Sequence, residues 1–152
     1  RQRQMCIRDR FRAYDMNEVA RYYAASEDVA EFLAHYPERH DFREEAGGNR
    51  VFINVWCWEP AWKIRVTENG RELPVRREQT EDPLYVISYD IPQSVWKGKY
   101  PVDYGKRGKQ HTLFTVDASG PATTLEIEVT DSFGKVYRET MTRPKAFGPQ
   151  MK

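Results

Sequence analysis

The sequence has little of the side-chain chemistry that builds catalytic or metal-binding centres. Its 152 residues include three histidines and two cysteines, Cys6 and Cys57. With Cys6 set aside (see below), Cys57 cannot form an internal disulfide, so cysteine usage leaves the redox compartment open. Cys57 stands in an apolar stretch without an adjacent base, which predicts a packed thiol rather than a nucleophile. No run of eighteen apolar residues occurs, so no helical membrane span is expected.

The first ten residues do not read like part of a folded domain. The segment RQRQMCIRDR resembles the translation of a transposase adapter used in short-read sequencing libraries. A natural basic arm that binds nucleic acid or membrane is the alternative. An adapter origin implies that the natural N-terminus, with any signal peptide, is missing. Without this segment the formal net charge changes from +1 to about −2, which gives no electrostatic case for a nucleic-acid partner.

Residues 15–36 have the pattern of two short helices that meet near Ser26. Asp15 is a candidate N-cap with Glu18 three positions on, and Ser26 is a second candidate N-cap. Pro37 ends the second helix, and residues 37–49 are a polar linker. We expect the apolar faces of these helices to be exposed in this chain and to contact a missing domain. The side chains assigned to that contact are Val19, Tyr22, Phe32 and Leu33.

From Arg50 onward the apolar residues recur at the period of β-strands. Asn69-Gly70 is a strong hairpin signal, and Pro74 indicates an edge strand or a bulge. Short strands joined by turns favour a mainly β fold, an immunoglobulin-like antiparallel β-sandwich of about seven strands preceded by one or two short helices. The expected strands cover residues 51–58, 63–67, 72–77, 84–89, 111–116, 125–130 and 136–141. The expected parts are 1–10 (adapter), 11–48 (helical lead-in), 49–147 (β-sandwich) and 148–152 (tail).

Three groups of residues are candidate binding sites, each with a plainer interpretation. His35, Glu38, His40 and Asp41 could hold a metal, but their spacing matches no strong zinc pattern, so solvated linker side chains are preferred. Residues 93–110 read as a long loop that either binds an anionic polymer or is simply solvated. Its cations are Lys97, Lys99, Lys106, Arg107 and Lys109. The tryptophans could form a sugar-stacking platform, although burial is expected for the first two; they are Trp56, Trp58, Trp62 and Trp96.

Several segments, in order, resemble one known family. They are Asn54-Val55-Trp56, Trp62-Lys63-Ile64, Glu68-Asn69-Gly70, Tyr89-Asp90-Ile91-Pro92, Val129 to Gly134 and Met141 to Phe147. The chain resembles the C-terminal domain of bacterial calcineurin-like metallophosphoesterases. The resemblance implies a catalytic core elsewhere in the parent protein, with two divalent metal ions held by Asp, His and Asn. The core's ligand motifs are absent here, because no glycine precedes Asp or His and Gly48-Asn49 is followed by Arg50.

The resemblance implies a non-catalytic accessory domain whose partner is the catalytic phosphoesterase domain of the same parent chain. We assign no catalytic, cofactor-binding or metal-binding residue to this sequence, and we expect no cofactor and no nucleic-acid partner. Family resemblance favours an exported protein. The main alternative is a free-standing β-sandwich that binds glycans or anionic polymers. A third reading, an intrinsic hydrolase, requires acid–base or metal-binding groups that converge in the fold.

Overall fold

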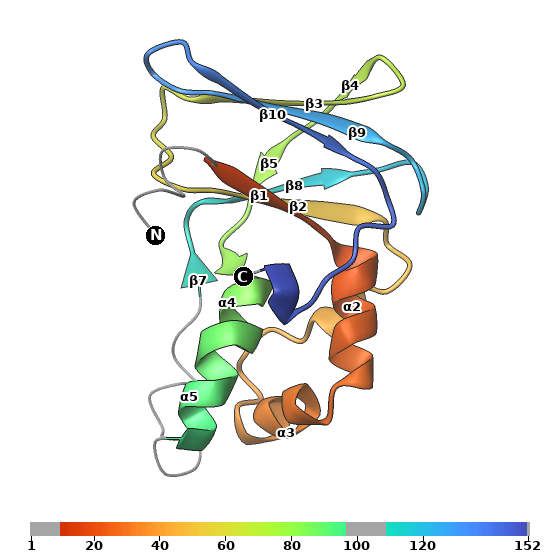
Figure 1. Cartoon of the computed structure of the whole chain (residues 1–152), viewed down its shortest axis with the longest axis vertical. Helices are drawn as coiled ribbons and strands as arrows, with labels where there is room; N and C mark the ends of the chain where they lie inside the picture. The colour runs from red at the N-terminus through yellow and green to blue at the C-terminus, as the bar shows by residue number, and fades with distance from the viewer. Residues whose placement is uncertain (1–9, 97–108, 152) are drawn as a thin grey trace.

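The chain forms three layers, two β-sheets and a layer of helices. The computed structural model describes residues 10–96 and 109–151. The outer sheet has the strand order β10 (Val136–Met141), β9 (Leu125–Thr130), β3 (Lys63–Glu68), β4 (Arg71–Leu73). The inner sheet has the order β1 (Phe11–Asp15), β2 (Arg50–Val55), β8 (Leu113–Asp117), β5 (Arg76–Arg77). Figure 1 shows the helices below the inner sheet, on the side away from the outer sheet.

The two central strands of the inner sheet, β2 and β8, are buried on both faces. Successive side chains of a strand point to opposite faces, and here both faces meet apolar layers. Ile53 of β2 and Phe114 of β8 pack between the two sheets, while Phe52 and Leu113 pack against the helices. This explains why residues 51–55 are apolar except for Asn54. The sandwich is therefore confirmed, with the helices as a third layer.

The outer sheet has one buried face, as its alternating sequence predicts. Ile127 and Val129 of β9 are fully buried. Glu126 is exposed, and Glu128 accepts a hydrogen bond from Arg138 Nε at 2.8 Å on the solvent side. All strand pairs among the described residues are antiparallel.

The hairpin at Asn69-Gly70 leads into the crossing from one sheet to the other. Both turn residues have positive φ, 53° and 78°, and join β3 to β4 as the sequence predicts. The expected strand 72–77 is two short strands, because Pro74 lies between β4 and β5. Each ends its own sheet, which agrees with the edge position that Pro74 indicated.

The segment expected to be a helical lead-in begins with a strand. β1 pairs with β2 along its whole length, from Phe11 opposite Val55 to Asp15 opposite Val51. α2 (Met16–Ala25) and α3 (Glu27–His35) follow, so the two helices are confirmed. Both predicted N-caps are formed: the Asp15 side chain accepts from the Asn17 amide and the Ser26 side chain from the Val29 amide.

The strand expected at residues 84–89 is helical, and this prediction is wrong. α4 (Pro83–Tyr85), the π-helix η2 (Val86–Asp90) and α5 (Ile91–Trp96) follow one another. Asp82 starts the segment by accepting hydrogen bonds from the Leu84 and Tyr85 amides, with Pro83 in the first turn, where its missing N–H costs nothing. Leu84, Ile87 and Ile91 are buried at helical spacing.

The expected exposure of the lead-in helices is also wrong. Val19 and Phe32 are fully buried and Leu33 is 8 % exposed. They pack with Ile87 and Ile91 of the unforeseen helix, which supplies the surface that the sequence left missing. Only Tyr22 of the proposed interdomain set is half-buried. The prediction that Val19, Phe32 and Leu33 contact an absent domain therefore loses its basis.

Two smaller expectations also differ from the structure. The linker 37–49 contains the 3₁₀ helix η1 (Phe42–Glu45), and Phe42 is fully buried. Cys57 is exposed at φ 60° rather than packed in a strand, because β2 ends at Val55. The remaining short elements are β6 (Thr80–Glu81), which pairs with β7 (Lys109–Gln110), and η4 (Pro149–Met151).

Candidate functional site

A group of buried charges links the turn after α3 to β6 and η2. Arg39, in the turn after α3, donates from Nη2 to Glu81 Oε1 at 3.1 Å and to Asp90 Oδ2 at 2.7 Å. The backbone amide of His40 donates to the second Glu81 oxygen at 2.7 Å. All three charged side chains are at most 5 % exposed. Burial lowers the pKa of Arg39, but the hydrogen bonds and charges of Glu81 and Asp90 outweigh it and raise this pKa.

Asp82, next to Glu81, joins the sheet to the helical segment. Its Oδ1 accepts from the Tyr14 hydroxyl at 2.7 Å, and its Oδ2 accepts from Asn54 Nδ2 at 2.6 Å. The same carboxylate caps the helix at Leu84. One buried side chain thus ties β1, β2 and α4 together. Burial, followed by the nearby Asp82 charge, holds the pKa of Tyr14 well above its usual range.

Tyr23 of α2 lies in the same charged interior. Its hydroxyl is buried and has no hydrogen-bond partner among the described residues. Burial raises its pKa well above the usual range, and the Glu81 charge adds to this effect. A buried phenol in this setting is held in its neutral form.

These groups form a network of hydrogen bonds and ion pairs inside the fold. Glu81, Asp82 and Asp90 are 2–6 % exposed. Their carboxylates accept hydrogen bonds from Arg39, Tyr14, Asn54 and backbone amides. A substrate would have to displace those bonds before reaching them. Sequence reasoning missed this network, although Asp82-Pro83 is a helix-start signal that could have located part of it.

The sequence-predicted metal candidates do not come together as a set. His40 approaches Glu44 and Glu45 of η1 instead, with possible ligand atoms within 4.8 Å of one another. His40 Nε2 is 3.2 Å from Glu44 Oε1, while Arg50 Nη1 already neutralises Glu45 Oε2 at 3.0 Å. Burial raises the pKa of Glu45, and the Arg50 charge opposes it. One carboxylate of this cluster is therefore already paired with a guanidinium.

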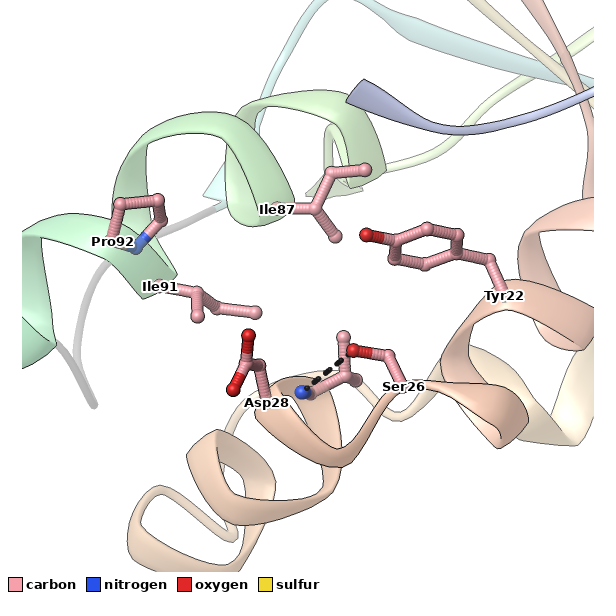
Figure 2. A pocket seen from close by; sticks show the side chains of 7 residues that line it. Tyr22, Ser26, Asp28, Ile87, Ile91 and Pro92 are labelled. Carbon is pink, nitrogen blue, oxygen red and sulfur yellow. Dashed lines mark hydrogen bonds between the residues drawn. The ribbon is translucent and has the colours of Figure 1, made fainter. Parts of the chain in front are cut away.

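An apolar groove of about 380 Å³ opens on the helical layer. Figure 2 shows it between the α2–α3 corner and the η2–α5 segment. Val29, Ile87 and Ile91 contribute its apolar walls. The Tyr22 hydroxyl points across it toward Ile87, and the Asp28 carboxylate points toward Ile91.

Three of the four tryptophans are half-buried, and each has a guanidinium over its ring. Arg12 lies 5.3 Å from the Trp56 centroid, Arg77 4.5 Å from that of Trp58, and Arg10 5.7 Å from that of Trp62. They do not form an open stacking platform. The Trp96 side chain lies outside the described structure. In the basic loop, Lys97, Lys99, Lys106 and Arg107 lie outside the described residues as well, while Lys109 is exposed in β7.

The fold and the buried polar network define an antiparallel β-sandwich domain with a fixed helical layer. Residues 11–137 match the family described as the C terminal of calcineurin-like phosphoesterase, so the chain belongs to that family. The match begins at Phe11, directly after the segment predicted to derive from an adapter. No curated protein and no solved structure matched the chain. Among the described residues, none of the helices has the length and apolar character needed to cross a bilayer.

Proposed function

We propose that this chain is a non-catalytic accessory domain that packs on and supports the metallophosphoesterase core of its parent enzyme. The family match over residues 11–137 carries the proposal. It is supported by the state of the acidic groups, because Glu81, Asp82 and Asp90 are buried and already hydrogen-bonded. The core would hold two divalent metal ions that clamp the phosphate and activate water.

The first test is hydrolysis of bis(p-nitrophenyl) phosphate by the purified chain with Mn²⁺, Zn²⁺ or Mg²⁺. We expect no turnover above the buffer rate. Turnover that disappears with a chelator and returns with metal would overturn the non-catalytic assignment. A His40→Asn variant is the matched check, because His40, Glu44 and Glu45 are the one ligand-like cluster found in the described part.

The second test measures support of the core. The parent enzyme's catalytic domain is expressed alone and together with this chain. We expect the two to co-purify, and we expect the chain to raise the melting temperature of the catalytic domain. Absence of both effects would contradict the accessory role.

One observation favours a second candidate, a glycan-binding module. Tyr85 and Tyr89 are 47 % and 40 % exposed, and their ring centroids are 5.1 Å apart. Adjacent exposed rings can stack on sugar faces. Glycan-array binding by the chain that is lost in Tyr85→Ala, but kept when the exposed Phe133 is replaced by Ala, would favour this function.

Polyphosphate binding that is lost in Lys109→Ser would favour the related anionic-polymer module.

A further inference from the structure

The exposed surface of α3 carries three acidic side chains. Glu27, Asp28 and Glu31 are exposed and have no ion-pair partner among the described residues. Several exposed charges elsewhere are paired, as in Arg65 with Glu72 at 3.0 Å and Arg76 with Asp117 at 3.2 Å. The helix N-terminus stabilises acidic residues in its first turn, but it leaves their outward oxygens open to a cation.

Asp28 connects this acidic surface to the apolar groove. Its carboxylate points toward Ile91, and the Tyr22 hydroxyl extends into the groove from α2 toward Ile87. The apolar walls are fixed, since Val29 is 1 %, Ile91 6 % and Ile87 8 % exposed. The groove therefore has an apolar floor, with one negative group and one hydroxyl at its edge.

We propose that this groove is the docking site for a basic side chain of the parent's catalytic domain. The Lys or Arg stem would lie along Ile87 and Ile91, and its cationic end would bind the Asp28 carboxylate. Long basic side chains bury an apolar stem while the charged end stays at a polar rim. A volume of about 380 Å³ is enough for such a side chain with part of its neighbour. The inference rests on the proposed accessory function and names the contact by which the domains meet.

The groove chemistry can be tested on this chain with three small probes of equal length. They are n-pentylammonium, n-pentanol and n-pentanoate, and binding is followed by NMR shifts of the Ser26, Val29 and Ile91 amides. We expect pentylammonium to bind best and pentanoate worst. Asp28→Asn should weaken pentylammonium binding about two- to fivefold, as for one partly exposed ion pair, and leave pentanol unchanged. Equal binding of all three probes, or an equal loss in the control Glu31→Gln, would overturn the proposal.

The docking itself is tested with the co-expressed catalytic domain. We expect Asp28→Lys to weaken the complex at least about tenfold by charge reversal, whereas the control Glu31→Lys should have a much smaller effect. If the wild-type complex forms and Asp28→Lys leaves it intact, the groove assignment fails while the accessory function stands. If the wild-type chain does not bind the catalytic domain at all, both fail.

Two other occupants are checked in the same experiments. A concentration-dependent dimer that Asp28→Lys dissociates would mean that the groove binds a second copy, which overturns the proposal. Stronger pentylammonium binding after Lys97→Ser and Lys99→Ser would mean that the chain's own basic segment fills the groove, which also overturns it.

Discussion

Arg39 Nη2 lies 2.7 Å from Asp90 Oδ2, which links the turn after α3 to the π-helix on the other side of the helical layer. The same nitrogen reaches Glu81 at 3.1 Å. One guanidinium therefore neutralises two buried carboxylates on two segments that are far from it in sequence. The helical layer depends on this contact as well as on its apolar core.

Replacing Arg39 by Met should destabilise the domain by about 3–5 kcal/mol, because it leaves buried carboxylates without their cation. Urea unfolding followed by circular dichroism measures the change. Arg43→Gln is the matched control, since Arg43 pairs with Asp41 at the surface, and it should cause little measurable change. Equal effects of both variants would show that the buried ion pairs do not stabilise the helical layer.

The sequence predicts the sandwich better than it predicts the helical layer, for a physical reason. Strands such as 125–130 alternate because one face meets water and the other meets the core, and this period is visible in the sequence. Residues 84–89 are apolar and partly β-branched, so their composition favours a strand. The Asp82 cap and burial against α3 determine that they are helical, and only the cap is local.

Packing between segments that are far apart in the sequence also decides where the candidate site residues lie. The sequence correctly predicts Val19, Phe32 and Leu33 as an apolar surface, but it favours a strand for the segment that covers them. These side chains therefore look exposed in the sequence, although the chain itself provides the helix that buries them. Arg39 and Asp90, 51 residues apart, have no shared sequence pattern, so their contact is visible only in the fold.

Asp82→Ala should cost about 2–4 kcal/mol. The helix loses its N-cap, worth about 1 kcal/mol, and the Tyr14 hydroxyl and Asn54 amide lose a buried acceptor, worth about 1–3 kcal/mol. Ser26→Ala is the control, because it removes an N-cap without that network. If both variants unfold at the same urea concentration, the Asp82 contacts to the sheet add nothing beyond the cap.

Tyr14→Phe and Tyr23→Phe each remove a buried hydroxyl. Only the Tyr14 hydroxyl has a hydrogen-bond partner among the described residues. The Tyr14 hydroxyl donates to Asp82, so its loss should destabilise by about 1–3 kcal/mol. The Tyr23 hydroxyl is buried without a described partner, so its loss should leave stability unchanged or raise it by about 1 kcal/mol. Unfolding curves of the two variants against wild type measure the difference. A destabilised Tyr23→Phe would indicate a hydrogen bond to a buried water.

The two buried phenols should also make the fold sensitive to alkali. Their pKa values are raised in the folded state, whereas phenols of the unfolded chain ionise near pH 10. Their contribution to stability is therefore fully present below about pH 10 and falls as the pH rises above it, because the unfolded chain then releases protons that the folded chain keeps. Absorbance at 295 nm and circular dichroism should show two tyrosines that ionise only as the protein unfolds. Tyr23→Phe should remove one of them and make the alkaline loss of stability less steep. Complete ionisation before any loss of folded signal would mean that neither phenol is protected by the fold.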